Sequence, residues 1–337
     1  MDKEEFMNDG VALCLPERMR SIIRALEVSG RYASVHTYRC ALRSFTEFAG
    51  SVVMSGPAAD VFTSGRLKSY QNWLLGKELS WNSISTYMRT LRAAYNRIFP
   101  PGSPGYVPGL FDEVYTRVES QTKRALSGEQ MQVLLSPRCG CVGIEGDVLR
   151  ALRYFRLMFL FRGMPFIDLA YLRKRDLKGD VLSYCRHKTG RRLTVRVPEE
   201  AAALLKEVAD TNPASIYLFP ILDGSLHEGA SLYRCYLGAL RRFNRNLRKV
   251  GVLLLGSAGI SSYTARHTWA TLAFHLCTPV GIISEALGHS SVRVTETYLK
   301  PFGNERVDKA NDFLITSVIM RDKKNNDLFN PLYNRRL

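Results

Sequence analysis

The sequence lacks any apolar run long enough to cross a bilayer. Its first ten residues, MDKEEFMNDG, also lack the basic and apolar regions that make a signal peptide. These two absences lead us to expect a cytoplasmic protein with no membrane partner. A chain of 337 residues is long enough for two domains, each with a core of its own.

Paired cysteines and acidic clusters are missing as well. The seven cysteines are scattered, and only Cys139 and Cys141 lie close together, with no second pair to complete a zinc site. An odd number of scattered cysteines is typical of free thiols in a reducing compartment. No cluster of acidic residues suggests a magnesium site. We therefore expect neither a metal nor any other cofactor.

Acidic residues are few beside the basic ones. The chain has 31 Asp and Glu against 47 Lys and Arg, which gives a net charge of +16. An excess of this size favours a polyanionic partner, and nucleic acid is a commoner one than a membrane where no amphipathic anchor is evident. Basic proteins without such a partner also exist, so charge alone leaves that alternative open.

The first hundred residues have the periodicity of amphipathic helices. Apolar residues recur at three- and four-residue spacing in two clear stretches, VHTYRCALRSFTEF and NSISTYMRTLRAAYNRIF. The arginines expected on the outer faces of these helices, where they could bind DNA, are Arg39, Arg43, Arg89 and Arg92. The proline- and glycine-rich stretch PPGSPGYVPG, residues 100–109, then interrupts the helical pattern.

The rest of the chain mixes helices with a β-hairpin. The strand-like runs VLSYCR and RRLTVRVP flank HKTG, which places Lys188 at the turn of the hairpin. A helix is expected after Ser127, although Glu129 does not complete the usual capping spacing. Further helices are expected over 146–161, 199–210, 229–249, 264–276, 280–287, 291–299 and 305–320. The predicted organisation is a helical domain over 1–105, a linker over 106–124, a mixed α/β domain over 125–320 and a basic tail over 321–337.

One predicted helix is strongly basic. The stretch YRCYLGALRRFNRNLRK, residues 233–249, has six basic residues and no acidic one. Its basic stripe consists of Arg234, Arg241, Arg245 and Arg248. A solvated basic face would be the ordinary explanation. Because no acidic residue is interleaved to relieve the repulsion, a phosphate partner is the better one.

Four residues of the second domain could form a phosphoryl-transfer site that needs no metal. They are Lys188 at the hairpin turn, Arg266 at the start of a helix, His289 after Gly288, and Tyr298 nine residues later. Each alone is ordinary, since such side chains are common in cores and on surfaces. Together they offer a tyrosine oxygen that can attack a phosphodiester, a guanidinium and an imidazole for the negative transition state, and an ammonium for the leaving oxygen.

Three segments that carry these residues resemble the signature of the tyrosine recombinases, the phage-integrase family. ARHTWAT resembles the segment of the family's second arginine, LGHSSVRVTETY its His-to-Tyr segment, and KTGRR its hairpin lysine. The N-terminal helices resemble a SAM-like core-binding domain, so the resemblance covers most of the chain. It implies a mainly α fold with a small β-sheet, in which the core-binding domain precedes a mixed α/β catalytic domain.

The resemblance also implies roles and a reaction. Tyr298 would be the nucleophile, Arg266 a phosphate clamp, His289 a transition-state donor and Lys188 the general acid. The chain would be a site-specific DNA recombinase that forms a 3′-phosphotyrosyl intermediate and exchanges strands through a Holliday junction. Its partners would be double-stranded DNA with inverted-repeat core sites and further copies of the chain, in a homotetramer on two DNA sites.

Two positions depart from the family's pattern. In FRGMPFIDL, Pro165 stands where the first catalytic arginine is expected, and Arg162 is the candidate to replace it, although it could also cap a helix end. Asp168 is expected to orient an arginine. Tyr263 stands where the family has a histidine, and its phenol can still donate a hydrogen bond to a phosphate oxygen. His267 is expected to be a buried structural residue, turned about 100° from the arginine before it.

The kind of recombinase and its rivals are less defined. Few residues precede the first expected helix, so no arm-binding domain is expected, which favours an invertase, a resolvase-like enzyme or the short integrase of a mobile element. One rival is a DNA-binding protein of the same fold that has lost catalysis, and another is an enzyme like the type IB topoisomerases. The tail, with Phe329, Leu332 and Tyr333, could dock on a neighbouring subunit or be a plain chain end.

Overall fold

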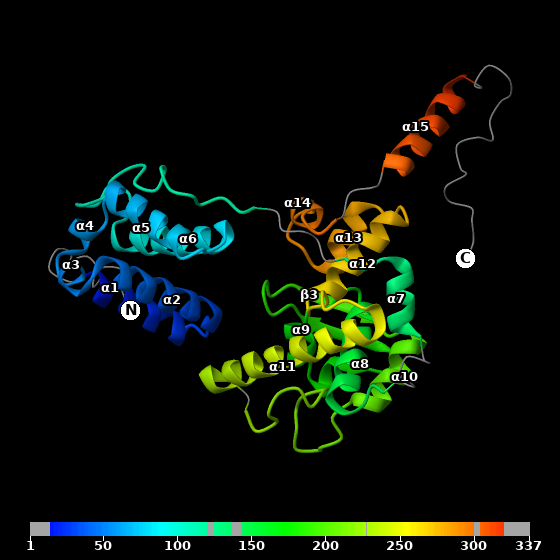
Figure 1. The fold of residues 1–337 in the computed structure, drawn as a ribbon. Coiled ribbons are helices and arrows are strands. Elements are labelled where there is room, and N and C mark those ends of the chain that lie inside the picture. Colours follow the sequence, from blue (N-terminus) through cyan, green and yellow to red (C-terminus); the bar gives the residue numbers. More distant parts are fainter. Residues whose placement is uncertain (1–13, 120–124, 137–142, 227, 300–303, 320–337) are drawn as a thin grey trace. The chain divides into compact units, whose positions relative to one another are not determined.

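The computed structural model of the chain describes residues 14–119, 125–136, 143–226, 228–299 and 304–319 (Figure 1). The Cys139–Cys141 pair and the basic tail therefore lie outside the described residues. The chain divides into two compact units, Met1–Thr122 with Asp223–Gly238, and Lys123–Leu222 with Ala239–Leu337. One boundary between the units falls inside a helix, between Gly238 and Ala239. The predicted domain ranges have no boundary there, and they stay a prediction.

The first unit is built from helices. In chain order they are α1 (Leu15–Val28), α2 (Tyr32–Ala49), α3 (Ser51–Met54), α4 (Ala58–Val61), α5 (Ser64–Gly76) and α6 (Trp81–Ile98). The apolar stripes of α2 and α6 enter one core, where Phe45, Met88 and Leu91 are completely buried. The Thr63 side chain caps α5 by accepting from the Arg66 N–H. The helical periodicity of this part of the sequence is thus confirmed.

The stretch after α6 packs on the same core. Leu110, Phe111 and Val114 are buried there. The Tyr95 hydroxyl accepts from the Val107 N–H at 2.5 Å and donates to the Gly105 carbonyl at 3.3 Å. The beginning of the expected linker therefore belongs to the helical unit, because its apolar residues find a buried surface there.

The second unit surrounds a small antiparallel sheet with helices. The sheet has the order β1-β2-β3, formed by β1 (Leu177–Lys178), β2 (Val181–Cys185) and β3 (Arg192–Arg196). Before it come α7 (Gly128–Leu135), α8 (Gly146–Leu160), α9 (Phe166–Tyr171) and the 3₁₀ turn η2 (Lys174–Asp176). After it come α10 (Glu199–Val208), the part of α11 (Gly229–Leu255) that begins at Ala239, α12 (Thr264–His275), α13 (Val280–Leu287), α14 (Val292–Glu296) and α15 (Asn304–Ile319).

The predicted hairpin is present. Strands β2 and β3 pair from Val181↔Arg196 to Cys185↔Arg192. The Arg186 N–H donates to the Arg191 carbonyl at 2.8 Å, and the Gly190 N–H donates to the Arg186 carbonyl at 2.8 Å, which closes the loop 187–190. Lys188 is exposed in this loop, as the sequence predicted.

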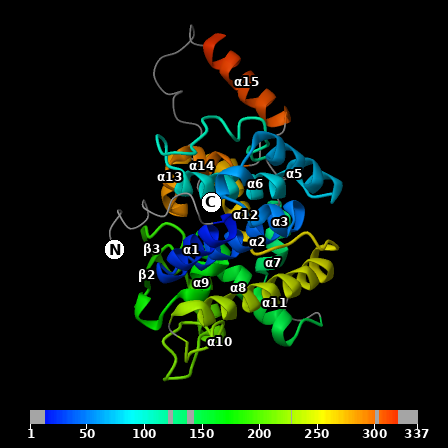
Figure 2. The ribbon, with the colours of Figure 1, turned by 90° about the vertical axis from the view of Figure 1, so that its left-hand side faces the viewer.

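Helix α11 is longer than predicted and has two contrasting sides. Its apolar stripe is buried and consists of Leu232, Tyr236, Ala239, Phe243, Leu247 and Val250. Helices α8 and α11 lie close together in the ribbon (Figure 2). Asn246 Nδ2 of α11 donates to the Asp147 carbonyl at 3.3 Å. The predicted basic stripe is exposed along the helix.

Two details differ from the expected elements. Ser127 begins α7 with a complete capping box, whose partner is Gln130 rather than Glu129, since the partner must stand three residues after the cap. Helix α14 ends at Glu296, so Tyr298 follows the helix instead of lying within it. Within the described residues, no helix is long and apolar enough to span a membrane.

Candidate active site

Arg266 is the centre of a buried cluster in the second unit. It lies in the first turn of α12 and is 2% exposed. Its Nη1 donates to the Gly163 carbonyl at 2.9 Å, and its Nη2 donates to the Leu287 carbonyl at 2.6 Å. Nη2 also lies 2.9 Å from His289 Nε2. One guanidinium thus joins the segment after α8, the end of α13 and the candidate histidine.

The chain must come very close to Arg266 at Gly163. This glycine has φ +67°, and a Cβ built on it would lie 3.1 Å from the Arg266 Cα and 3.3 Å from the Trp269 Cβ. A side chain would therefore meet backbone, which cannot yield, in a backbone conformation that favours glycine. The segment RGMP brings its carbonyl to the guanidinium only because position 163 has no side chain.

His289 is held in one orientation. Gly288, in the left-handed conformation, ends α13 and turns the chain so that the next residue enters the cluster. Because arginine only donates, His289 Nε2 must accept from Arg266, so Nδ1 carries the proton and donates to Thr295 Oγ1 at 2.8 Å. Thr295 is completely buried. A position near the end of α14 therefore fixes the tautomer of the histidine.

The imidazole of His289 is neutral at pH 7. Burial, and after it the positive charges of Arg266, Arg186 and Lys188, together lower its pKa to about 4. The side chain is 7% exposed. A positive charge on this ring would add to a set of positive charges already present, so the site favours the uncharged form.

Tyr298 lies beside this pair. Its ring centroid is 4.9 Å from the His289 ring and 4.9 Å from the His267 ring. The Arg266 Cζ lies 5.5 Å from the Tyr298 ring centroid. Thr271 Oγ1 donates to the Tyr298 carbonyl at 3.4 Å, which ties the segment after α14 to α12. His267, expected to be a buried structural residue, is half-buried and packs against the Tyr298 ring.

The hairpin supplies further positive charge. Lys188 is exposed in its loop, and its charge is among those that lower the pKa of His289. Arg191, which closes the loop, donates through Nη1 to the His289 carbonyl at 2.7 Å. The hairpin, with Lys188 in its loop, thus adds positive charge near His289.

The two positions that depart from the family's pattern lie around this cluster. Pro165 is buried and precedes α9 as its N-cap residue. Arg162 has φ +58°, and its Nη1 lies 3.4 Å from the Thr194 carbonyl of β3. The Tyr263 side chain is 51% exposed, but its hydroxyl is desolvated enough to raise its pKa, and Tyr298 raises it further.

A second buried guanidinium belongs to the cluster and was not predicted. Arg186, directly after β2, is 7% exposed and pairs through Nε with Asp168 Oδ2 at 2.8 Å. Its Nη1 donates to the Leu287 carbonyl, the same oxygen that Arg266 contacts. Asp168 was expected to orient an arginine, and this arginine is Arg186. The sequence signal available was the basic stretch CRHKTGRR, which points to the hairpin without singling out Arg186.

The predicted DNA-binding arginines are exposed in both units. This holds for Arg39, Arg43, Arg89, Arg92, Arg234, Arg241, Arg245 and Arg248. Two of them have polar partners: Arg39 pairs with Glu27, and Arg234 donates to Ser231 Oγ at 3.1 Å. Exposure leaves these guanidinium groups accessible to a polyanion, and their DNA contacts stay a prediction.

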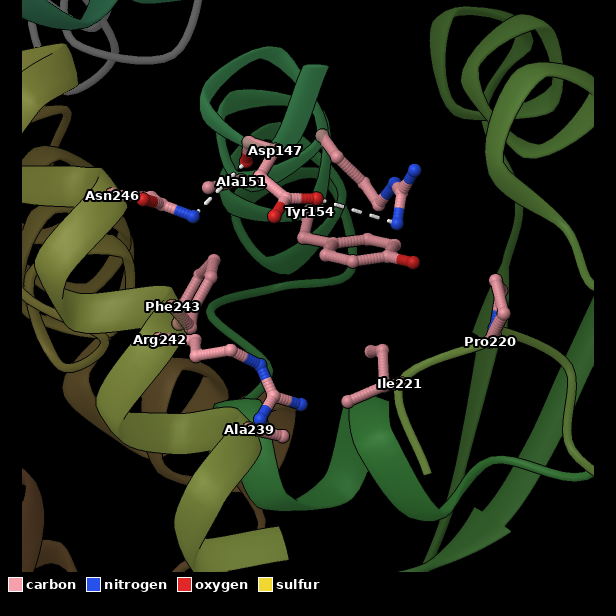
Figure 3. Close-up of a pocket in the computed structure, with 10 residues that line it drawn as sticks. Asp147, Ala151, Tyr154, Pro220, Ile221, Ala239, Arg242, Phe243 and Asn246 are labelled. Atoms are coloured by element: carbon pink, nitrogen blue, oxygen red, sulfur yellow. Dashed lines mark hydrogen bonds and ion pairs between the residues drawn. The ribbon is translucent and has the colours of Figure 1, made fainter. Parts of the chain in front are cut away.

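A pocket of the second unit lies elsewhere. It is lined by residues of α8, α11 and the segment at Pro220 and Ile221, and none of the candidate residues lines it (Figure 3). Asp147 pairs with Arg150 at 3.5 Å on its rim, and its carbonyl accepts from Asn246. The contact of Asn246 with Asp147 holds α11 against α8, and we assign the pocket no role in the chemistry.

Comparison with known proteins identifies the fold. No protein-family model matches the chain, and no curated protein matches it. Among solved structures, the Tn1549 transposon integrase (its residues 82–397) in complex with transposon right end DNA is similar with a TM-score of 0.60 and 14% identity, covering 90% of this chain and 100% of that one. The fold class predicted from the sequence is confirmed by this similarity.

Two further structures agree. A lambda integrase dimer bound to a COC′ core site has a TM-score of 0.57 and 13% identity, and covers 86% of this chain and 78% of that one. The XerH site-specific recombinase bound to its difH substrate, a pre-cleavage complex, has a TM-score of 0.54 and 17% identity, and covers 87% and 83%. The chain therefore has the fold that these tyrosine recombinases share.

Proposed function

We propose that this chain is a site-specific DNA recombinase that cleaves and rejoins DNA through a 3′-phosphotyrosyl intermediate. The observation that carries the proposal is the position of Tyr298 beside Arg266 and His289, in a chain with the fold of the tyrosine recombinases. A tyrosine against a buried arginine and a histidine is the set of groups that a transesterification at phosphorus requires.

In the proposed reaction, the Tyr298 oxygen attacks the scissile phosphorus and the bond to the 5′-oxygen breaks. The phenolic proton passes to Nε2 of the neutral imidazole of His289, which becomes free when Arg266 turns its guanidinium to the phosphate. Lys188 gives a proton to the departing 5′-oxygen. Arg266 neutralises the negative charge that develops on the non-bridging oxygens. The free energy of the phosphodiester is kept in the phosphotyrosine ester, so a DNA hydroxyl can reverse the step without ATP or a metal.

The low pKa of His289 fits this sequence of proton transfers. In the free protein the ring is neutral because it is buried among positive charges. A bound phosphate offsets those charges and raises the pKa of the ring, since an opposite charge favours the ionised form. The imidazole can then take the phenolic proton and donate a hydrogen bond to a phosphoryl oxygen, which is the transition-state role proposed for it.

The proposal also covers the DNA partner, the oligomeric state and the location in the cell. The neighbours of this fold are structures in complex with DNA. We propose that this chain acts on double-stranded DNA with inverted-repeat core sites, as a homotetramer on two sites, in the cytoplasm. Integration, excision and inversion are all compatible with one transesterification chemistry. The eight exposed arginines named above are the proposed DNA contacts.

The proposal is tested by covalent trapping. The full chain is incubated with sheared DNA of the cell that carries its gene, the mixture is denatured in detergent, and DNA that stays linked to protein is sequenced. We expect linked DNA that ends at a defined core sequence, joined through its 3′-phosphate. Tyr298→Phe should give no linked DNA because it lacks the attacking oxygen, while its DNA affinity in a mobility-shift assay stays at the wild-type value.

The other outcomes separate the rivals. Linked DNA from Tyr298→Phe would show that another residue is the nucleophile. Wild-type protein that binds DNA but links none would be a DNA-binding protein of the same fold without catalysis. Relaxation of a supercoiled plasmid that lacks the recovered core sequence would indicate an enzyme like the type IB topoisomerases.

A further inference from the structure

The candidate site has a gap where a second cation is expected. Pro165 has no charge to offer. Arg162, the predicted replacement, directs its guanidinium to the Thr194 carbonyl at 3.4 Å. Its charge opposes the rise in the pKa of the Tyr184 hydroxyl, whereas the largest effects on the pKa values of Arg266 and His289 come from other groups. The structure places a different guanidinium beside those two residues.

Arg186 and Arg266 converge on one acceptor. Arg266 Nη2 donates to the Leu287 carbonyl at 2.6 Å, and Arg186 Nη1 donates to the same oxygen. Two guanidinium groups on one carbonyl oxygen must lie close together, and their repulsion is evident in Arg266. Burial lowers the pKa of Arg266, and the neighbouring charge of Arg186 lowers it further.

The charges of this cluster do not balance. Among the described residues, Asp168 is the one carboxylate that pairs with either guanidinium, and His289 is neutral at pH 7. Burial also raises the pKa of Asp168, against the opposing effect of Arg186. A buried excess of positive charge is costly unless an anion compensates it. The cluster is therefore suited to an oxyanion.

Guanidinium donors without an acceptor also favour the binding of an oxyanion. The buried Nε of Arg266 has no hydrogen-bond acceptor among the residues that the structure describes. Among the described residues, Arg186 contacts Asp168 through Nε and the Leu287 carbonyl through Nη1, so its Nη2 can donate to another acceptor. A phosphate has several non-bridging oxygens and accepts from planar guanidinium groups.

We propose that Arg186 contacts the scissile phosphate as the second guanidinium of this site, in the place that neither Pro165 nor Arg162 fills. Asp168 is its positioning residue, because it pairs with the Arg186 side chain and accepts from the His187 N–H at 2.8 Å. The hairpin thus delivers two cations from neighbouring positions, Arg186 at its base and Lys188 in its loop. This inference rests on the proposed recombinase function.

The test uses Arg186→Ala in the full chain with a nicked suicide duplex of the core sequence recovered by covalent trapping. Two forms of the duplex are compared, one with an ordinary scissile phosphodiester and one with a methylphosphonate, which has one negative charge fewer. We expect Arg186→Ala to slow covalent trapping by about 100-fold on the phosphodiester. The defect should shrink by about tenfold or more on the methylphosphonate, because less charge needs neutralising.

A matched control is Arg196→Ala on β3. Arg196 also pairs through Nε with an aspartate, Asp180 Oδ2 at 3.0 Å, but both side chains are exposed. We expect this variant to trap DNA at the wild-type rate on both duplexes. Asp168→Asn should slow covalent trapping less than Arg186→Ala does, and its defect should also be smaller on the methylphosphonate. An ion pair with only a structural role would give a defect of equal size on both duplexes.

Each remaining outcome decides a different point. Trapping by Arg186→Ala at the wild-type rate would overturn the role of Arg186, and so would a defect of equal size on the two duplexes. If Arg186→Ala does not fold, as judged by its thermal melt, the comparison of the two duplexes is made with Arg186→Lys and read in the same way. Absence of any adduct from the wild-type chain would refute the proposed function itself.

Discussion

At the scale of single residues, the main effect is the concentration of positive charge around a neutral histidine. His289 is packed between Arg266, which donates to its Nε2, and Thr295, which accepts from its Nδ1. Burial and three neighbouring cations hold its pKa near 4 in the folded chain, whereas a free histidine has a pKa near 6.5. This difference links the stability of the fold to pH.

We predict that the wild-type chain loses stability through His289 between pH 6.5 and pH 4. In this window His289 is protonated in the unfolded chain and neutral in the folded chain. The free energy of unfolding therefore falls as the pH falls, by roughly 2 kcal/mol at pH 4. Above pH 6.5 neither state is protonated there, and the term vanishes. Urea denaturation of wild type and His289→Gln at several pH values measures the effect.

The comparison of the two chains isolates His289. Other groups titrate equally in both, so the difference between their unfolding free energies should favour wild type most above pH 6.5 and shrink towards pH 4. A His289→Gln difference that is constant from pH 7.5 to pH 4 would contradict the prediction.

The residues of the candidate site show what a sequence can and cannot predict. Tyr298, Arg266, His289 and Lys188 could be chosen from the sequence because their local segments have a characteristic spacing. Arg186 could not be separated from its neighbours in CRHKTGRR, since its burial depends on Asp168, which precedes it by 18 residues, and on the Leu287 carbonyl, 101 residues away. Long-range packing decides which of several arginines is buried.

At the scale of elements, hydrophobic periodicity predicted the helices well and their ends less well. The apolar residues of α2, α6 and α11 repeat every three or four positions and are buried as expected. Ends depend on single side chains, as at Ser127, where Gln130 completes the cap. They also depend on tertiary contacts, as after α14, where Thr271 holds the Tyr298 carbonyl.

The exposed stripe on α11 carries the prediction at this scale. If Arg241, Arg245 and Arg248 each contact a phosphate, replacing all three by alanine removes three released counterions. The plot of log Kobs against log salt concentration has a negative slope on B-DNA, and the magnitude of this slope should then decrease by about 2 to 3. Mobility shifts of a duplex of arbitrary sequence at several salt concentrations measure this slope.

A control triple removes the same charge from another surface of the second unit. Arg153 pairs with Glu207 at 2.6 Å, while Arg175 and Lys206 are exposed. The three alanine substitutions lower the net charge as much as those on α11 do. We expect them to leave the slope near its wild-type value. Equal slopes for the two triples would mean that α11 has only a solvated basic face.

At the scale of the whole molecule, the site is completed within one chain. The Tyr298 ring lies 5.5 Å from Arg266 Cζ and 4.9 Å from the His289 ring of the same chain. The proposed nucleophile and the proposed phosphate clamp therefore lie in one protomer, although the proposed assembly has four. A tyrosine contributed by a neighbouring protomer would need a different position of the segment after α14.

We predict that cleavage occurs in cis, which a mixing experiment tests. Tyr298→Phe lacks the nucleophile and Arg266→Ala lacks the clamp, so no protomer in their mixture has both groups. The mixture should form no more covalent adduct on the suicide duplex than either variant alone, while a mixture of wild type with Arg266→Ala should form adduct in proportion to the wild-type share. If the two inactive variants restore adduct when mixed, one protomer must supply its tyrosine to the clamp of another. That result would mean that the position of Tyr298 beside its own Arg266 is not the arrangement in which the chain cleaves DNA.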